Sequence, residues 1–357
     1  MYCKQGIIGV QFSHSQRGHG LCCSTHERYN DSPLKVWQDK LADARHKISK
    51  NTKVTACTSC YSAEEKGVKS FRQIYNDQFK NFTETNLPQH MDLDFSNLCN
   101  LKCIMCGPDR SSTWAKEKNL FTATNGVTSI TAEDLEEVCR LSADLKYITL
   151  QGGEPTLVNE YQTHFQYLKD NNIIKNVSLN VVTNLTNLNT KFFSYLPYFK
   201  DVSISVSVDA FGLANDYIRY PSKFSKITDN IKNLNQFDNV NVNVDTAIQI
   251  LSMFNIDHFN GWIKDLDSHF KKNNQPFQQY VQHVWMPECL HINNAPDTLK
   301  KQFIQSTQNT AFEHLTKSFK SSSYDTKKTL QFLDSIDLAR NISVVDFIPE
   351  LGLHYQV

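Results

Sequence analysis

The sequence predicts an α/β protein in three parts: a cysteine-rich module (1–88), an open, partial (β/α)6 barrel (89–290) and a helical C-terminal segment (291–357). Six β-rich runs alternate with helical stretches from residue 91 onward, which predicts parallel βαβ units. Eight of the ten cysteines lie within the first 106 residues. The length of 357 residues and the apolar content of 40% supply a sizeable core in two or three domains, and they exclude a wholly disordered chain.

The expected strands are short runs rich in Val, Ile, Thr and aromatic residues, which favour extended structure. Six such units fit an open partial barrel better than a closed eight-fold one. The runs cover residues 91–95, 146–151, 177–183, 202–208, 240–250 and 280–285.

Helical patterns separate these runs, and Thr131 is the expected N-cap of the first one. Two further helices are expected within the first 88 residues, at 33–47 and 63–76. The C-terminal segment is expected to be helical in two pieces, with a polar break at 321–323. The helices between strands are expected at 132–145, 159–169, 190–198, 222–237 and 257–271.

The charge balance gives no electrostatic reason to propose nucleic acid or an anionic membrane as the main partner. Lys plus Arg and Asp plus Glu are both 37, so neither nucleic acid nor an anionic membrane is expected to bind. The mean hydropathy is −0.46, and no run approaches the roughly 18 apolar residues of a membrane span. The first ten residues are not expected to form a signal peptide. We therefore expect a cytoplasmic protein, in which clustered cysteines favour metal binding over disulfides.

The strongest motif is a C-x3-C-x2-C run, formed by Cys99, Cys103 and Cys106 directly after the first expected strand of the barrel. Three thiolates on one tight loop can bind three irons of a [4Fe–4S] cluster and leave the fourth iron open for a small molecule. A structural zinc site needs a fourth ligand nearby. The nearest histidine in sequence is His90, which lies before the strand.

A second motif, Gly152-Gly153-Glu154-Pro155, follows the second expected strand. Two glycines allow the backbone to approach a ligand closely, and the glutamate can accept a hydrogen bond from an ammonium group. Both motifs stand at carboxyl ends of parallel strands, where α/β barrels carry their sites.

Together the two motifs resemble those of the radical S-adenosylmethionine (SAM) superfamily, and the resemblance covers about residues 89–290. It implies that the three-cysteine loop binds a [4Fe–4S] cluster whose open iron chelates the amino and carboxylate groups of SAM. It also implies that Met105 packs on the adenine. Gly152, Gly153 and Glu154 would then receive the methionyl amino group.

The resemblance extends to polar residues that end later strands. Thr183 and Asn184 are implied to face SAM, Asp209 to contact a ribose or the substrate, and Arg219 to pair with a carboxylate. As ordinary loop residues, Asn184 and Asp209 equally suit a turn or a helix cap. The implied chemistry is one-electron cleavage of SAM to methionine and a 5′-deoxyadenosyl radical, which abstracts hydrogen from an unactivated carbon.

The N-terminal cysteines resemble the auxiliary-cluster ligands of the twitch domain, the shorter relative of the SPASM domain. Cys3, Cys23, Cys57 and Cys60 form a C-x14-G-x4-C pattern followed by C-x2-C. The resemblance implies an auxiliary [4Fe–4S] cluster, although four thiolates also suit structural zinc. Cys22 competes with Cys23, and spacing favours Cys23. A module that precedes the barrel is similar to N-terminal-twitch radical SAM proteins, several of them in phage sequences.

The resemblance implies an oxygen-sensitive enzyme that oxidises or cross-links a peptide or protein side chain, with a flavodoxin- or ferredoxin-type electron donor. Two alternatives stay open: dehydrogenation or rearrangement of a sugar or aminocyclitol, and a non-catalytic binding protein stabilised by zinc or a cluster. Of the other cysteines, Cys139 is expected in the core of a helix face. Cys289 follows the last strand and is expected to be a partly buried, inert thiol; the alternatives are that it donates a hydrogen atom or reaches a cluster.

Overall fold

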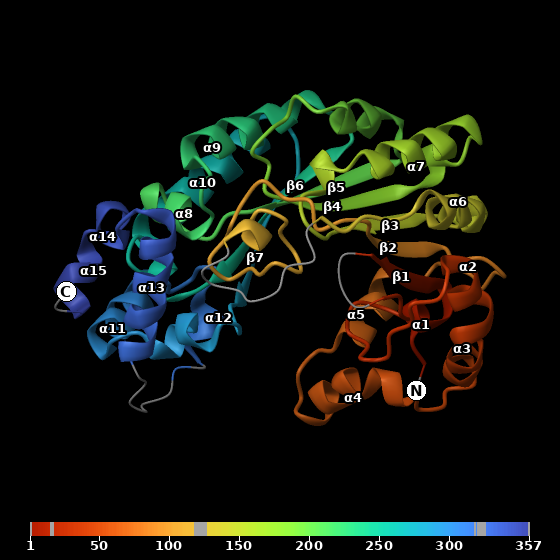
Figure 1. Ribbon diagram of the computed structural model, residues 1–357, viewed down its shortest axis with the longest axis horizontal. Helices are drawn as coiled ribbons and strands as arrows, with labels where there is room; N and C mark the ends of the chain where they lie inside the picture. Colours follow the sequence, from red (N-terminus) through yellow and green to blue (C-terminus); the bar gives the residue numbers. More distant parts are fainter. Residues whose placement is uncertain (1, 15–17, 118–126, 318, 320–325, 356–357) are drawn as a thin grey trace. The chain divides into compact units, whose positions relative to one another are not determined.

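The computed structural model describes residues 2–14, 18–117, 127–317, 319 and 326–355. Its strands form one seven-stranded sheet in chain order, β1-β2-β3-β4-β5-β6-β7 (Figure 1). The pairings of β1 with β2, β2 with β3, β3 with β4 and β6 with β7 are parallel. The predicted α/β class with an open parallel sheet is therefore confirmed. The strands are β1 (Gly9–Ser13), β2 (His90–Asp94), β3 (Tyr147–Leu150), β4 (Ser178–Thr183), β5 (Asp201–Ser207), β6 (Val240–Ile248) and β7 (Phe277–His283).

Strand β1 is an addition to the six strands that the sequence predicted. It comes from the cysteine-rich N-terminal region and pairs with β2, with Gly9 opposite His90 and Ser13 opposite Asp94. All five of its residues are buried, including the polar Gln11 and Ser13, so burial does not alternate along this short strand. The sheet therefore begins about 80 residues before the barrel was expected to start.

The predicted helices between strands are present, with one difference in type. Residues Lys191–Tyr198 form 3-10 turns, with Pro197 inside them, instead of an α-helix. The helix expected at 63–76 is two helices, because Gly67 adopts a φ of 71° between them. The polar break expected at 321–323 lies outside the described residues. The principal helices are α1 (Lys4–Ile8), α3 (Ala42–Ser49), α4 (Thr58–Glu65), α5 (Phe71–Gln78), α6 (Ala132–Leu141), α7 (Asn159–Asp170), α8 (Leu213–Ile218), α9 (Phe224–Asn233), α10 (Ile256–Lys272), α11 (Asp297–Ser306), α13 (Thr326–Arg340) and α14 (Val344–Phe347).

The chain divides into two compact units. Unit 1 comprises Met1–Leu98, Val127–Val182 and Thr190–Val202, and it contains β1–β3, most of β4 and helices α1–α7. Its N-terminal helices gather beside β1, and α1 contacts α3, α5 and β1 (Figure 1, red to orange). No helix in the described part of the chain is long and apolar enough to cross a membrane.

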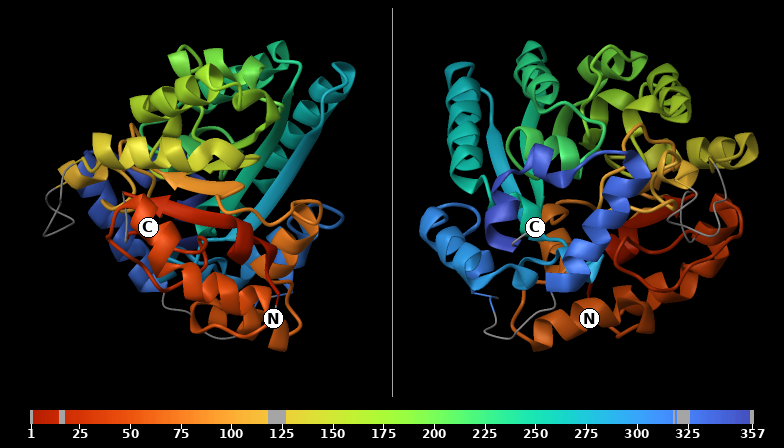
Figure 2. Two further views of the ribbon diagram at one scale, coloured as in Figure 1. Left: turned by 90° about the vertical axis from the view of Figure 1, so that its right-hand side faces the viewer. Right: turned by 60° about the vertical axis from the view of Figure 1, so that its left-hand side comes forward.

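Unit 2 comprises Cys99–Gly126, Thr183–Asn189 and Ser203–Val357, and it contains most of β5, β6, β7 and helices α8–α15. Helix α10 lies alongside β7 (Figure 2). A buried apolar cluster joins α8 to the C-terminal helices α13 and α14, and it includes Trp114, Tyr217, Leu333 and Ile348. The partly buried Met105 and Cys106 pack against this cluster, so the core of unit 2 supports the three-cysteine loop directly.

Candidate functional site

The three-cysteine loop is held by backbone hydrogen bonds within unit 2. The amide of Lys102 donates to the carbonyl of Tyr220 (2.6 Å), and the amide of Ile104 donates to the carbonyl of Ile218 (2.8 Å). These two bonds flank Cys103, so the residue between the two acceptors lies opposite it. The three thiols of the loop are all half-buried.

That opposite residue is Arg219, which contacts both the loop and the end of β5. Its Nη1 donates to Cys103 Sγ (3.8 Å), while Nε and Nη2 lie 2.7 Å and 3.1 Å from the two carboxylate oxygens of Asp209. Asp209 is 1% exposed and also accepts from the amide of Ala247 (2.9 Å). Both oxygens of Asp209 are thus engaged inside the protein, and its predicted ribose or substrate contact stays a prediction.

Burial and charge act on this group in opposite directions. Burial disfavours the charged guanidinium of Arg219, but Asp209 and then the Cys103 thiol outweigh that effect and raise its pKa. Burial also raises the pKa of the Cys103 thiol, against the opposing influence of Arg219. The pKa of Cys106 is raised by burial, against a hydrogen bond from the Gly107 amide. Iron binds the thiolate form of cysteine. Arg219 and the Gly107 amide favour that form at Cys103 and Cys106, respectively.

A buried polar group braces the loop from α13. Arg340 donates from Nη2 to the carbonyl of Lys102 (2.6 Å), and its Nε lies 3.4 Å from Glu117 Oε1. Lys102 Nζ lies 2.7 Å from the same carboxylate oxygen. Trp114 donates from Nε1 to the carbonyl of Cys103 (2.7 Å) and stacks under the Arg340 guanidinium at 5.0 Å. Trp114, Glu117 and Arg340 were not predicted from the sequence, because no local motif links residues so far apart.

In unit 1 the glycine-rich loop is bonded to the segment that leads into the first cysteine. The amide of Gly153 donates to the carbonyl of Ser96 (3.0 Å), and the amide of Glu154 donates to the carbonyl of Leu98 (2.7 Å). Leu98 directly precedes Cys99 in the chain. The two predicted motifs are therefore connected through one residue.

Both glycines of this loop occupy positions that a side chain would obstruct. Gly152 has a φ of +116°, and a Cβ there would lie 2.3 Å from Asp94 Oδ1. A Cβ on Gly153 would lie 2.3 Å from the Leu98 carbonyl oxygen. Glu154 is buried, and its Oε1 accepts from the amide (3.1 Å) and hydroxyl (2.7 Å) of Thr156. Its predicted contact with an ammonium group stays a prediction.

Thr183 ends β4, and Asn184, the next residue, contacts the cysteine loop within unit 2. Asn184 Nδ2 donates to the side chain of Asn100 (2.9 Å), the residue after Cys99. Asn100 in turn donates to Thr186 Oγ1 (2.9 Å). The structure thus brings Asn184 beside the loop, and the predicted contacts of this pair and of Met105 with SAM stay predictions.

Four N-terminal cysteines line one small cavity in unit 1, and they are not the four that spacing favoured. Cys3, Cys22, Cys57 and Cys60 line this thiol cavity, whereas Cys23 is not among its lining residues and is exposed. Cys3 caps α1 and accepts from the Gly6 amide through Sγ (3.4 Å). The sequence could not separate two adjacent cysteines, and the fold distinguishes them.

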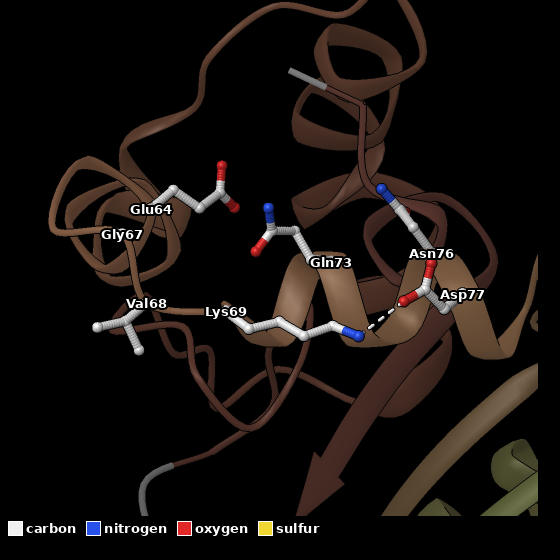
Figure 3. A pocket seen from close by; sticks show the side chains of 7 residues that line it. All are labelled: Glu64, Gly67, Val68, Lys69, Gln73, Asn76 and Asp77. Carbon is white, nitrogen blue, oxygen red and sulfur yellow. Dashed lines mark hydrogen bonds and ion pairs between the residues drawn. The ribbon is translucent and has the colours of Figure 1, made fainter.

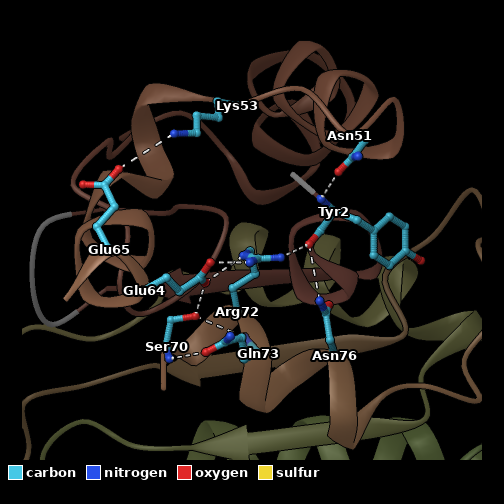
Figure 4. A network of polar contacts seen from close by, with 9 residues as sticks. All are labelled: Tyr2, Asn51, Lys53, Glu64, Glu65, Ser70, Arg72, Gln73 and Asn76. Atoms are coloured by element: carbon cyan, nitrogen blue, oxygen red, sulfur yellow. Dashed lines mark hydrogen bonds and ion pairs between the residues drawn. The ribbon is translucent and has the colours of Figure 1, made fainter. Parts of the chain in front are cut away.

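Arg72 also lines this cavity. Figure 4 shows the polar network that holds its side chain. Arg72 donates from Nη1 to the carbonyl of Tyr2 (2.7 Å) and from Nε to Glu64 (3.0 Å). Burial raises the pKa of Cys3 to about 11, and Arg72 is one of the influences that oppose it. Burial, and then Cys3 and Cys60, raise the pKa of Cys57 to about 12.

Within the described residues, no three Cys, His, Asp or Glu side chains are arranged to hold one metal ion. Four thiolates around a single zinc stand about 3.8 Å from one another, given a Zn–S distance of about 2.3 Å. In an iron–sulfur cluster each thiolate binds a different iron, so the sulfurs stand further apart. The [4Fe–4S] clusters expected at the loop and at the thiol cavity, and the zinc alternative at the cavity, stay predictions.

A second hollow in unit 1 lies between the end of α4 and α5 (Figure 3). Lys69 and Asp77 form an ion pair across α5 at 2.8 Å. Its lining is Glu64, Gly67, Val68, Lys69, Gln73, Asn76 and Asp77.

Comparison with known proteins relates the central part of the chain to a family. Residues 93–266 match the family model of the radical SAM superfamily. This segment is slightly less than half of the chain, and the match shows that it is similar to radical SAM domains.

Individual proteins that resemble this chain have low sequence identity to it. An uncharacterized protein of Methanocaldococcus jannaschii is 28% identical over 132 residues, which are 37% of this chain and 42% of that protein. The chain therefore matches less than half the length of this curated relative. The solved structure of anSMEcpe with bound AdoMet has a TM-score of 0.41 and 17% identity, covering 60% of this chain and 57% of that one. Streptococcus suis SuiB bound to its precursor peptide SuiA has a TM-score of 0.40 and 12% identity, covering 91% and 70%.

Proposed function

We propose that this protein is a radical SAM enzyme that binds a [4Fe–4S] cluster through Cys99, Cys103 and Cys106. One observation carries the proposal: three thiols share a loop that follows a parallel strand inside the segment that is similar to radical SAM domains. When bound, the cluster and SAM would supply a 5′-deoxyadenosyl radical for hydrogen abstraction.

The protein's own residues would position these groups and exclude water. The bonds from Trp114 and Arg340 hold the backbone of the cysteine loop, and the core of unit 2 buries one side of it. The backbone of Gly152, Gly153 and Glu154 would receive the methionyl end of SAM, since glycine leaves the loop open to close approach. Met105 would pack on the adenine, and Thr183 and Asn184 would supply polar contacts.

We further propose that the N-terminal module (1–88) holds an auxiliary [4Fe–4S] cluster, and that Cys22 takes the place that spacing gave to Cys23. Cys3, Cys22, Cys57 and Cys60 share one cavity, and this supports the choice. Four thiolates ligate every iron, which suits an electron relay or acceptor.

The proposed substrate is a peptide or protein side chain, which would be oxidised or cross-linked. The support is the resemblance of the N-terminal module to twitch domains, whose enzymes often act on peptides. A flavodoxin- or ferredoxin-type protein in the cytoplasm would supply the electrons.

The test is anaerobic reconstitution followed by assay of iron, acid-labile sulfide and dithionite-dependent 5′-deoxyadenosine formation. The wild type should bind about eight irons, and the Cys99/Cys103/Cys106→Ala variant should bind about four, with SAM cleavage only in the wild type. Cys139→Ala is the matched control, because this buried thiol on α6 is not proposed as a ligand. A wild type that binds no cluster and cleaves no SAM would contradict the proposal.

The same assay assigns the auxiliary ligand. Cys22→Ser should lower the iron content to about four while Cys23→Ser keeps about eight. The reverse result would show that Cys23, and not Cys22, is the fourth ligand of the auxiliary cluster. About four irons plus one zinc in the wild type would make the N-terminal site a structural zinc centre.

A further inference from the structure

Contacts of both the backbone and the side chain hold Arg219 against the cysteine loop. The backbone bonds of Ile218 and Tyr220 to the loop hold the residues on both sides of it. Its own amide donates to the carbonyl of Asn215 in α8 (2.8 Å). The backbone of Arg219 therefore has little freedom to move away from Cys103.

The side chain is equally constrained. Asp209 holds Nε and Nη2 through its two oxygens, and it leaves Nη1 to donate to Cys103 Sγ at 3.8 Å. The Asp209 carboxylate is itself fixed by the amide of Ala247, and Asn215 accepts from the Asp209 amide (3.0 Å). The side chain of Arg219 is only 12% exposed and that of Asp209 is 0% exposed, so water screens this pair weakly.

We propose that Arg219 donates an N–H···S hydrogen bond to the Cys103 thiolate and so raises the reduction potential of the cluster, with Asp209 as the positioning residue that aims it. This inference rests on the proposed function. Reduction adds one electron to the cluster and forms or breaks no bond. A cation that donates to a ligand sulfur stabilises the more negative, reduced state, and hydrogen bonds to the sulfurs tune such potentials.

The competing role is the one implied by resemblance, in which Arg219 binds the carboxylate of SAM. The two roles make different predictions for a cluster studied without SAM. A guanidinium that acts on the sulfur changes the potential in the absence of SAM, whereas one that serves only the SAM carboxylate leaves that potential unchanged.

The experiment is an EPR-monitored redox titration of the full-length, anaerobically reconstituted protein in the absence of SAM. The relevant signal is the one that SAM addition perturbs in a parallel sample, which separates it from an auxiliary cluster. In Arg219→Gln we expect a more negative midpoint, with about a tenfold lower ratio of reduced to oxidised cluster at a fixed potential; for one electron this is 59 mV. Arg219→Lys keeps the charge but loses the planar fork, so its midpoint should lie between the two.

Lys271→Gln is the matched control, because it removes one positive charge from an exposed pair with Asp267 on α10 of the same unit. Its midpoint should equal that of the wild type. A wild-type midpoint in Arg219→Gln would overturn the proposal, even if SAM cleavage fell. If Arg219→Gln fails to bind iron, Arg219→Lys is titrated instead, and a midpoint equal to that of the wild type would overturn the proposal. A wild type without any cluster would instead contradict the proposed function.

Discussion

At the scale of a single residue, Gly153 has room for no side chain. A Cβ would lie 2.3 Å from the Leu98 carbonyl oxygen and 2.7 Å from the carbonyl carbon of Asn97. Both neighbours are backbone atoms, so relief requires the chain to shift and not merely a side chain to rotate. The shift would fall on the segment that leads directly into Cys99.

Gly153→Ala should therefore destabilise the protein by about 1–3 kcal/mol and lower the rate of SAM cleavage. Urea unfolding and 5′-deoxyadenosine assays would measure the two effects. Gly261→Ala is the control, because this glycine lies inside α10 with nothing within 4 Å of the added Cβ. It should stabilise the protein by about 0.5–1 kcal/mol. Equal stabilities for the two variants would contradict this account.

Residue identities at the site were predictable where a local motif carried them. The sequence placed Cys99, Cys103, Cys106 and the glycine-rich loop after two successive strands, and they follow β2 and β3, while their roles stay proposals. The choice between Cys22 and Cys23 was not predictable, because adjacent side chains point in different directions and only the folded backbone decides which one faces the thiol cavity. The partner of Asp209 was equally hidden, since α8 brings Arg219 back to the strand end.

At the scale of secondary-structure elements, α13 contacts the cysteine loop through its last residue, Arg340. Arg340 is 0% exposed at its side chain and pairs with Glu117, whose side chain is 5% exposed, while it also bonds the carbonyl of Lys102. A helix near the C-terminus thus fixes the cysteine loop from a distance of more than 200 residues in sequence.

Arg340→Met keeps most of the aliphatic volume but leaves the Lys102 carbonyl without this donor. We expect a loss of about 3 kcal/mol, at the low end for a broken buried pair, because Lys102 still pairs with Glu117. The measurement is the free energy of unfolding in urea. Arg140→Met, which breaks an exposed pair with Glu136 on α6, should cost about 0.5 kcal/mol or less. Similar losses in both variants would show that the buried group does not brace the loop.

The elements of the barrel were predictable because their residues alternate or repeat with clear periods. Strand β1 was missed because it is short and buried throughout. The two helices α4 and α5 were merged because a polar, helix-favouring composition continues across the turn at Gly67, whose positive φ the sequence does not reveal. These errors arise where tertiary contacts or a single backbone angle override local pattern.

At the scale of the whole molecule, unit 1 buries several histidines in their neutral form. Burial lowers the pKa of His19 and His164 to about 4 and that of His90 to about 3. The unfolded chain binds these protons near pH 6.5, so their contribution to stability is full above pH 6.5 and is lost as pH falls toward 4. Burial raises the pKa of Asp92 to about 7. Its effect on the pH dependence of stability therefore has the opposite sign, and it offsets the effect of about one histidine.

The free energy of unfolding should therefore fall as pH is lowered from 7 to 5. His164, which is fully buried and lies 2.9 Å from Ser142 Oγ through Nε2, should account for about 2 kcal/mol of that fall. His164→Gln should remove this share, whatever its effect at pH 7. Urea titrations at the two pH values test the point, and parallel pH dependence in the two proteins would exclude His164 as a source.

The pairing of β1 with β2 has a consequence for biosynthesis. Gln11 and Asp92 lie 81 residues apart in the chain. Ribosomes add about 5–20 residues each second, so β1 leaves the ribosome roughly 4–16 seconds before its partner strand has been made. During that interval the apolar side chains of Val10 and Phe12 have no sheet to cover them. The nascent chain must pass through a stage in which its earliest strand is available to chaperones.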